Sequence, residues 1–161
     1  MELLKIDESM ISETSKFAQY VFIDYYNDLI GNKQAEYMAD KFLSETAIRA
    51  LLDDGAVFKI VKENDEIIGF YECKDEEKRV FLSKLYVDKR FRGKGIGRMM
   101  FEDIKKYAES CGKNTIYLTV NKYNSPSLQM YLYLGFKIIE AVETDIGHGY
   151  IMDDYIMEYT F

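Results

Sequence analysis

The sequence predicts an α/β protein of the α+β type, in which a mixed sheet of about seven strands is flanked by helices. Three observations predict this class. Helical segments fill most of the chain before Gly55, and a strand, a glycine-rich turn and a helix follow one another from Val80 to Cys111. Two long strand-like segments then close the chain. With 161 residues the chain can bury one hydrophobic core, so we expect a single domain over residues 1–161.

The first third of the chain is expected to be mainly helical. Leu3–Ile6 is a short apolar strand, and Ser9 is a candidate N-cap for the helix that follows. Apolar residues then recur at three- and four-residue spacing from Ile11 to Leu29, which is the pattern of one buried helical face. A shorter helix is expected over Ala35–Phe42, and a third runs from its cap Ser44 to Gly55. Three helices therefore precede the central strands.

The rest of the chain is expected to supply most of the sheet. Segments rich in β-branched and aromatic residues, bounded by turn residues, are typical of strands. The expected strands are Val57–Val61, Ile67–Glu72, Val80–Val87, Thr115–Val120, Lys137–Thr144 and Tyr150–Tyr159. Helices are expected over Gly97–Cys111 and from Ser125 onward, because Gly112 is a typical helix stop and Pro126 suits a first helical turn.

Composition and charge exclude several classes of function. The net charge of −7 argues against a general nucleic-acid-binding protein. One histidine, His148, and two separated cysteines, Cys73 and Cys111, supply too few ligands for a His/Cys metal site or a disulfide framework. No apolar run approaches the roughly eighteen residues of a membrane span, and no signal peptide is recognised. We therefore expect a cytoplasmic protein without metal, nucleic-acid or membrane partners.

The basic, glycine-rich loop Asp88–Arg98 is the most informative stretch of the chain. A strand, a glycine turn and a helix in succession aim backbone N–H groups and the positive end of the helix dipole at an anion. Glycines let a phosphate approach the backbone closely. Five cations crowd this loop although the chain is acidic overall: Lys89, Arg90, Arg92, Lys94 and Arg98. We interpret the loop as a pyrophosphate site, with a plain surface turn as the alternative.

The spacing of the glycines narrows the choice of ligand. Gly93, Gly95 and Gly97 read G-x-G-x-G, which is neither the dinucleotide fingerprint nor a P-loop. Arg92-x-x-Gly95-x-Gly97 instead resembles the Arg/Gln-x-x-Gly-x-Gly/Ala loop of the GNAT superfamily of N-acetyltransferases. The stretch Asn121–Phe136 resembles that family's other motif, Asn-x-x-Asn/Ala followed by a helix that ends Tyr-x-x-x-Gly-Phe. Because both motifs occur in the family's order, the chain is identified as a member of this superfamily, whose fold is a mixed, mostly antiparallel sheet with helices on both sides.

The resemblance implies acetyl-CoA as the cofactor and assigns residues to it. The strand before the loop would pair with the pantetheine arm, much as a peptide adds to a sheet edge, although these residues also suit a plain core strand. This role falls to Leu85, Tyr86 and Val87. The loop would bind the pyrophosphate through Arg92, Gly93, Lys94, Gly95, Ile96, Gly97 and Arg98. Gly95 and Gly97 are expected to tolerate no side chain. Asn121 and Asn124 would bind the pantetheine and the distal part of the cofactor, with turn formation and helix capping as the alternative.

Tyr131 is the predicted catalytic residue. It matches the tyrosine of Tyr-x-x-x-Gly-Phe, whose hydroxyl in this family lies by the cofactor sulfur and protonates the leaving thiolate. A proton donor at that position lowers the barrier to thiolate departure. The alternative is a core tyrosine, because Leu128, Tyr131, Leu132 and Gly135 form an apolar stripe. The same residue is expected to contact the cofactor.

The general base is not identified by the resemblance. Many members of the family carry Glu-x-Leu-Tyr-Val on the cofactor strand, but here Ser83 and Lys84 precede Leu85 and no carboxylate is present. Deprotonation of the substrate ammonium would then proceed through water or another carboxylate. Glu72, Asp153 and Asp154 are candidates, although each also fits a solvated strand position.

The acceptor is expected to be a small-molecule amine that attacks the acetyl group directly. A looser resemblance, over the C-terminal stretch and the helical region before Gly55, is to bacterial spermidine/spermine N-acetyltransferases. Polyamines are multiply cationic, and acidic residues would line their entrance: Asp24, Asp28, Glu36, Asp40, Asp153 and Asp154. Cation–π contacts would come from Tyr20, Tyr25 and Tyr26. The same residues equally suit an ordinary helix surface and a homodimer patch. Alternatives are an acetyltransferase of peptide N-termini or amino acids, and a non-catalytic coenzyme A-binding regulator.

Overall fold

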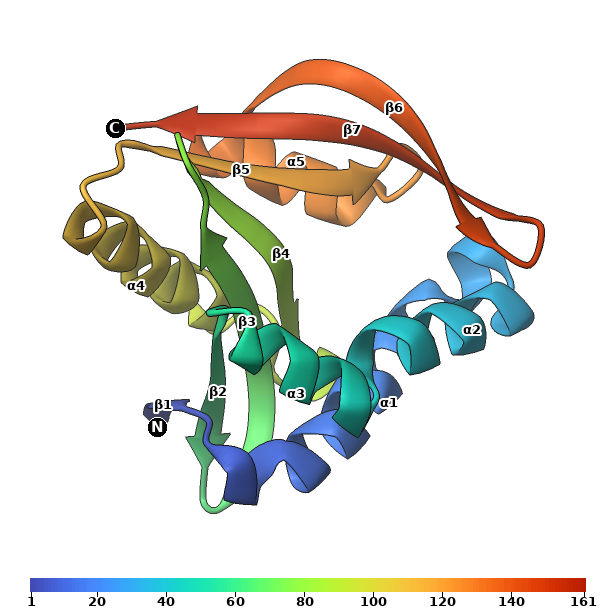
Figure 1. The fold of residues 1–161 in the computed structure, drawn as a ribbon, viewed down its shortest axis with the longest axis horizontal. Coiled ribbons are helices and arrows are strands. Elements are labelled where there is room, and N and C mark those ends of the chain that lie inside the picture. Colours follow the sequence, from blue (N-terminus) through green and yellow to red (C-terminus); the bar gives the residue numbers. More distant parts are fainter.

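The computed structural model describes all 161 residues and contains one seven-stranded sheet. Along the sheet the strands lie in the order β1-β2-β3-β4-β5-β7-β6 (Figure 1). Their bounds are β1 Glu2–Lys5, β2 Val57–Glu63, β3 Glu66–Asp75, β4 Val80–Val87, β5 Thr115–Asn121, β6 Lys137–Gly147 and β7 Tyr150–Thr160. All neighbouring strands are antiparallel except β4 and β5. The predicted mixed, mostly antiparallel sheet is therefore confirmed.

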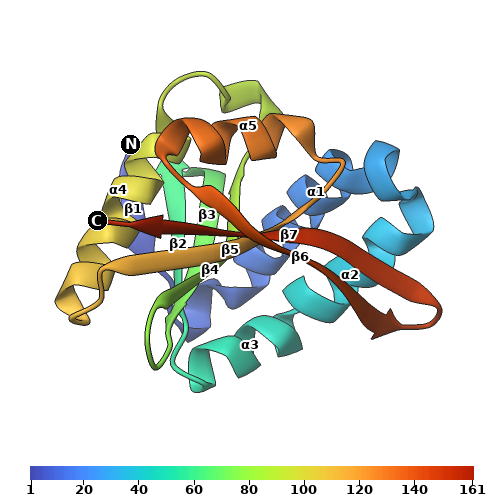
Figure 2. The same ribbon diagram turned by 90° about the horizontal axis from the view of Figure 1, so that it is seen from above.

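Five α-helices cover the two faces of this sheet (Figure 2). They are α1 Ile11–Ile30, α2 Asn32–Leu43, α3 Glu45–Asp53, α4 Ile96–Ser110 and α5 Ser125–Leu134. One apolar core joins the sheet to α4 and α5, around Met100, Phe101 and Phe136. A second core joins the other face to the first three helices, around Phe22, Leu43 and Phe70. The sheet therefore separates two layers of helices. The single domain over residues 1–161 remains a prediction.

Capping side chains begin α3 and α5 where the sequence predicts, whereas α2 begins at Asn32, three residues before the predicted Ala35. The Ser44 hydroxyl accepts from the N–H of Ala47 at the start of α3, and Asn124 accepts from Ser127 at the start of α5. Ser9 is not the N-cap of α1, so that expectation is wrong. Ser9 lies inside a short 3₁₀ turn, where its own N–H donates to Asp7, and α1 begins after Met10 without a side-chain cap. The reason is that the Asp7 carboxylate accepts from both the N–H and the hydroxyl of Ser9, so the Ser9 hydroxyl is used as a donor to Asp7 instead of capping α1.

The sheet divides between β4 and β5, and this division positions the functional site. The two strands pair only at Val80–Ile116 and Phe81–Tyr117, and beyond those pairs they separate (Figure 1). The rest of β4 keeps its pairing with β3, while β5 keeps its pairing with β7 along its whole length. From Leu82 to Val87, β4 therefore has one edge without a strand partner. No helix is long and apolar enough to cross a membrane.

Candidate active site

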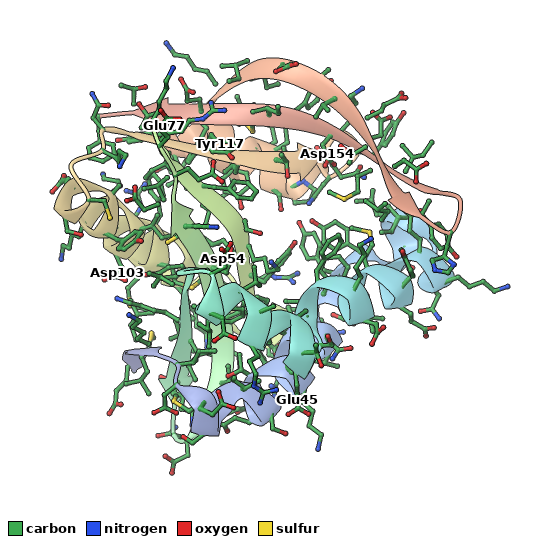
Figure 3. All side chains as sticks on the ribbon, viewed as in Figure 1. Glu45, Asp54, Glu77, Asp103, Tyr117 and Asp154 are labelled. Atoms are coloured by element: carbon green, nitrogen blue, oxygen red, sulfur yellow. The ribbon has the colours of Figure 1, made fainter.

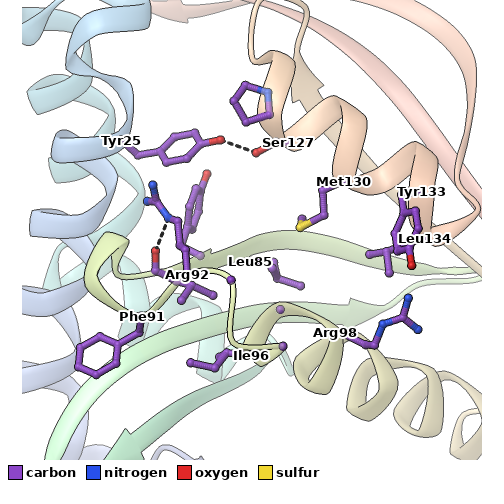
Figure 4. Close-up of a pocket in the computed structure, with 16 residues that line it drawn as sticks. Tyr25, Leu85, Phe91, Arg92, Ile96, Arg98, Ser127, Met130, Tyr133 and Leu134 are labelled. Carbon is purple, nitrogen blue, oxygen red and sulfur yellow. Dashed lines mark hydrogen bonds between the residues drawn. The ribbon is translucent and has the colours of Figure 1, made fainter.

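A cavity of about 530 Å³ lies beside the open edge of β4, between the glycine-rich loop and α5 (Figure 4). Most of the residues predicted to bind the cofactor line it: Leu85, Tyr86, Val87, Arg92, Gly93, Gly95, Ile96, Gly97 and Arg98. Its opposite wall comes from α1 and α5, through Tyr25, Ser127 and Met130. The volume lies within the usual range of small-molecule and cofactor sites. The sequence-predicted loop and strand thus meet in one cavity.

The loop presents unpaired backbone N–H groups at this cavity. The amides of residues 92–95 donate to no protein acceptor, and the first amide of α4 to find one is Met99, which donates to the Gly95 carbonyl. Gly95 is left-handed, with φ +80° and ψ 10°, a conformation that costs glycine nothing because it has no Cβ. Free amides at a helix N-terminus favour an anion. The loop therefore fits the pyrophosphate of coenzyme A.

Two arginines flank the loop in ordered positions. The Arg92 Nε donates to the Val87 carbonyl oxygen at 3.0 Å, and its guanidinium lies 5.0 Å from the centre of the Tyr25 ring. The Arg98 guanidinium lies 5.6 Å from the centre of the Tyr133 ring. Planar guanidinium groups held against aromatic rings lose little freedom when they bind phosphate oxygens. The loop thus supplies both backbone donors and oriented positive charge.

Gly95 and Gly97 differ in how well the protein tolerates a side chain at each position. A side chain at Gly95 is strained by the positive φ, whatever the space around it. Gly97 has an ordinary helical φ, and an added Cβ would lie 3.8 Å from the Met130 sulfur, an ordinary contact. Within the protein itself Gly97 therefore accepts a small side chain. The predicted intolerance at Gly97 depends only on how closely a cofactor approaches.

Four residues predicted to bind the cofactor do not line this cavity: Lys94, Asn121, Asn124 and Tyr131. The Lys94 ammonium lies 5.1 Å from the centre of the Phe91 ring, on the outer side of the loop. Asn124 is buried, and its carboxamide oxygen accepts from the Tyr25 hydroxyl at 2.7 Å and from the Ser127 N–H at 3.4 Å. In this structure Asn124 caps α5 and links it to α1. Helix capping is the alternative role that the sequence predicts for this residue.

Sequence reasoning did not assign a cofactor role to the aromatic and polar residues that complete the cavity. The Tyr25 hydroxyl contacts the Ser127 hydroxyl at 2.6 Å and so joins α1 to α5 across the top of the cavity (Figure 4). The sequence predicts only a contact with a cationic substrate for Tyr25, and it predicts no role for Tyr133, which is 79% exposed. No local sequence pattern marks either residue as part of a cofactor site, because both positions fit ordinary helical spacing.

A second cavity of about 240 Å³ lies on the other face of the sheet, beneath α1 and α2. It is lined by side chains from α1, α2, β4, β5 and β7, including Asn121. Tyr86 is the only residue that lines both this cavity and the larger one. The two cavities therefore adjoin at Tyr86, on the part of β4 that no longer pairs with β5.

Tyrosine hydroxyls cluster where the cavities meet. The Tyr86 hydroxyl donates to that of Tyr26 at 3.2 Å, and the ring of Tyr26 lies 5.0 Å from that of Tyr25. Tyr131 is buried beside them, and its hydroxyl forms no hydrogen bond within the protein. Burial, and then the neighbouring Tyr26 and Tyr25, raise the pKa of Tyr131. Tyr131 therefore keeps its proton at neutral pH, which a proton donor requires.

The three candidate bases lie in different surroundings. The sequence predicts a solvated strand position for each, but Asp154 and Glu72 are buried. Asp154 is 6% exposed and lines the second cavity, on the side of β7 that faces α1 and α2 (Figure 3). Glu72 is 2% exposed and pairs across β3 and β4 with Lys84, whose ammonium lies 4.0 Å away. Asp153 does not line this cavity, and its carboxylate binds the Lys122 ammonium at 2.7 Å. Only Asp154 faces a cavity.

Burial changes the protonation of these groups. Burial, and secondarily the Asp153 carboxylate, raise the pKa of Asp154 to about 6, against the lowering effect of Lys122. Burial likewise raises the pKa of Glu72 and lowers that of Lys84, while their mutual attraction opposes both shifts. A carboxyl with a pKa near 6 is mostly ionised at pH 7 and can still exchange a proton there.

The fold and the loop together define an acetyltransferase. A family model described as the acetyltransferase (GNAT) family matches residues 18–136. The chain therefore belongs to this family, and the predicted family, fold and class of enzyme are confirmed.

Individual relatives carry several different names. The chain is 27% identical over 148 residues to a probable N-acetyltransferase, san, of Drosophila melanogaster, covering 89% of this chain and 71% of that protein. It is 31% identical over 81 residues to a spermine/spermidine N(1)-acetyltransferase of Bacillus subtilis, covering 45% of this chain and 53% of that one. The fold matches the PaiA N-acetyltransferase from Thermoplasma acidophilum, solved in complex with coenzyme A, with a TM-score of 0.83 over 99% and 98% of the two chains at 21% identity.

Proposed function

We propose that this acetyltransferase transfers the acetyl group of acetyl-CoA to a primary amine, which attacks the thioester directly. The observation that carries the proposal is the meeting of two cavities at Tyr86, one built from the predicted cofactor residues and the other lined by a buried carboxylate. The predicted cofactor agrees with membership of the family and with the coenzyme A complex of the Thermoplasma protein. Coenzyme A, when bound, supplies the activated acetyl thioester.

In this proposal the larger cavity binds the cofactor. The free amides of the loop and the guanidinium groups of Arg92 and Arg98 bind the pyrophosphate. The edge of β4 without a strand partner offers the backbone groups of Leu85 and the N–H of Val87 to the pantetheine arm, because alternate residues face opposite edges and the Val87 carbonyl already accepts from Arg92. Asn121 and Lys94 remain predicted to bind the cofactor, although they lie outside the cavity wall.

The proton balance assigns a role to the buried tyrosine. The acceptor ammonium first loses one proton, to Asp154 or water and then to solvent. As the N–C bond forms and the C–S bond breaks, we propose that the Tyr131 hydroxyl gives its proton to the departing sulfur. The phenolate of Tyr131 then takes the second proton from nitrogen. One proton is released to solvent for each acetyl group transferred, and Tyr131 returns to its starting state.

A polyamine, as predicted from the sequence, is one candidate acceptor, supported by the similarity to the Bacillus spermine/spermidine enzyme. A peptide N-terminus is the second candidate, supported by similarity to N-alpha-acetyltransferase 50 of Danio rerio, 26% identical over 146 residues, 88% of this chain and 77% of that one. A cytoplasmic location and a homodimer stay predictions. A non-catalytic regulator is the remaining alternative.

A thiol-release assay with purified protein and acetyl-CoA tests the proposed function. Spermidine, phenethylamine, an aminoglycoside, free amino acids and a short peptide serve as acceptors. We expect free coenzyme A to appear in proportion to an acetylated amine, identified by mass. Tight binding of acetyl-CoA without acetylation of any amine would instead favour the regulator.

A further inference from the structure

The walls of the second cavity are mainly apolar. Helices α1 and α2 contribute Phe22, Ile30, Met38 and Phe42, and the sheet contributes Phe81 and Met152. A ligand that fills such a cavity removes apolar surface from water, which favours binding in proportion to the area removed. The cavity therefore favours an acceptor whose body is apolar over one that carries charge along its length.

The charges in this cavity oppose a polycation. Asp154 is its only carboxylate, and Lys84 is a buried ammonium in the same wall. A second or third ammonium of a polyamine would lie against apolar or neutral polar side chains or near Lys84, and no second carboxylate lines the cavity to pair with it. An unpaired ion held away from water is strongly unfavourable. One cationic head is therefore accommodated and further ones are not.

The acidic residues expected to attract a polyamine lie outside this cavity. Asp24 and Asp28 line a separate, more open hollow, where the Asp24 carboxylate lies 3.3 Å from the Lys89 ammonium. The Glu36 carboxylate accepts from the Asn32 amide at 2.9 Å, on the exposed face of α2. Of the predicted acidic set, only Asp154 reaches the second cavity.

The Asp154 carboxylate has no donor within the protein. It lies directly opposite Asn121 across β7 and β5, yet no hydrogen bond or ion pair joins it to any side chain or backbone N–H. The neighbouring Asp153 forms an ion pair with Lys122, 2.7 Å away, on the other side of the strand. A buried carboxylate without a partner is costly, and an ammonium ligand would supply the missing donors. This cavity therefore contains a built site for one ammonium.

We propose that the acceptor is a primary monoamine on an apolar body, such as an arylalkyl or branched alkyl amine, and that Asp154 pairs with its ammonium. The inference rests on the proposed function, because it takes the second cavity as the acceptor side. The amine nitrogen on Asp154 then lies in the cavity that Tyr86 shares with the cofactor side. Asp154 binds the acceptor and receives its first proton.

The electrostatic surroundings of Asp154 support this role. The titratable and charged groups around it are Asp153 on β7, Lys122 after β5, Tyr26 on α1 and Lys84 on β4. Because its pKa is about 6, the carboxyl loses its charge below that pH. Amine affinity is therefore expected to weaken as the pH falls through 6, and this pH dependence is expected to vanish in Asp154→Asn.

The test compares acceptors and variants in parallel. Phenethylamine and isoamylamine are compared with spermidine for kcat/KM, and the binding of phenethylamine to the protein without acetyl-CoA is measured by calorimetry. We expect both monoamines to exceed spermidine by about tenfold or more, because one unpaired buried ammonium costs at least that much. Asp154→Asn is expected to weaken phenethylamine binding about ten- to a hundredfold, the range for a hydrogen bond to a charged group.

A matched control removes one carboxylate from the same strand outside the cavity. Glu158→Gln breaks the pair with Arg79, four residues along β7, and is expected to leave phenethylamine binding unchanged. Spermidine turning over faster than both monoamines would overturn the proposal, as would normal phenethylamine affinity in Asp154→Asn. A lower melting temperature in Asp154→Asn, with amine binding lost in proportion, would make the residue structural and would also overturn it. The affinity for acetyl-CoA, measured without amine, tests the proposed function separately. If acetyl-CoA binds, the outcomes above concern only the choice of acceptor amine.

Discussion

The two cavities that meet at Tyr86 are built in different ways. The larger one depends on a continuous segment, β4 and the loop after it, and its anion site is made of backbone N–H groups at the start of α4. The smaller one is made of side chains from five elements that are far apart in the sequence. Backbone sites tolerate many sequences as long as glycines keep the loop open. Side-chain sites change with single substitutions, so cofactor binding and acceptor choice are separable properties here.

The largest effect is expected at the backbone site. Gly95→Glu introduces a strained φ and a negative charge where the pyrophosphate approaches the amides. Each hydrogen bond to a charged group contributes about 1.5–3 kcal/mol, so losing one or two weakens acetyl-CoA binding about a hundredfold or more. Isothermal titration with acetyl-CoA measures this. The control is Gly112→Glu, which has a similar strained φ of +72° at the other end of α4 and open space around it. Equal affinity in the two variants would exclude the loop as the pyrophosphate site.

The next effect concerns the point where the cavities meet. Tyr131→Phe keeps the ring, which packs 5.5 Å from that of Phe136, and removes only the hydroxyl. A general acid contributes roughly a hundred- to ten-thousandfold, so turnover is expected to fall about tenfold or more while acetyl-CoA affinity and melting temperature stay near those of the parent. Steady-state kinetics, calorimetry and thermal unfolding check the three quantities. Tyr133→Phe, on the same helix, is the control. Parental turnover in Tyr131→Phe would remove this residue from the catalytic assignment.

A smaller effect is expected at Asp154 in the second cavity, where ionisation of the carboxyl changes the free energy of unfolding. Asp154 has a folded pKa of about 6, above its ordinary value of 3.8, so the folded state binds its proton more tightly than the unfolded state does. The free energy of unfolding therefore falls as the pH rises from about 4 to 6. The shift corresponds to about 3 kcal/mol, and water in the open cavity reduces it to roughly 1–2 kcal/mol.

Urea unfolding of the parent and of Asp154→Asn from pH 4 to 8 measures this contribution. The variant is expected to lack the decline and to be the more stable of the two at pH 7, although it binds amine poorly. A residue that weakens the fold and is needed for binding has a functional role. If the variant were the less stable one at pH 7, Asp154 would be a structural residue of β7.

The smallest effect tests the capping interpretation of Asn124. Asn124→Ala removes the acceptor for the Ser127 N–H and the Tyr25 hydroxyl, which is expected to cost about 1 kcal/mol of stability, the usual value of an N-cap. If capping is its main role, acetyl-CoA affinity changes less than about threefold, well under the 1.4 kcal/mol of a tenfold change. Denaturant unfolding and calorimetry distinguish the two. A tenfold loss of affinity with full stability would show that Asn124 binds the cofactor.

The sequence predicted that the loop and the strand before it lie together because its signals there are local. The glycines, the cations and the strand before them lie within about twenty residues, and their conformation follows from short-range sterics and hydrogen bonding. The order of strands and helices was predictable for the same reason. The Ser9 cap was predicted wrongly because two neighbouring polar residues, Asp7 and Ser9, compete for the same turn.

The acceptor side could not be predicted because its signals are not local. Glu72, Asp153 and Asp154 look alike in the sequence, as acidic residues on expected strands. Which one is buried at a cavity depends on the separation of β4 from β5 and on how α1 and α2 cover the opening. Asp154 thus became the candidate acceptor residue only in three dimensions.

By itself, the sequence determined the family, the class of reaction and the loop proposed to bind an anion, because short motifs carry the backbone geometry those functions need. Tertiary structure alone decided which residues line the second cavity, that Asp154 faces it without a partner while Asp153 pairs with Lys122, and that Tyr86 joins the two spaces. The physical reason is that burial and charge pairing are set by contacts between elements distant in the chain, and these contacts leave no periodic pattern in the sequence.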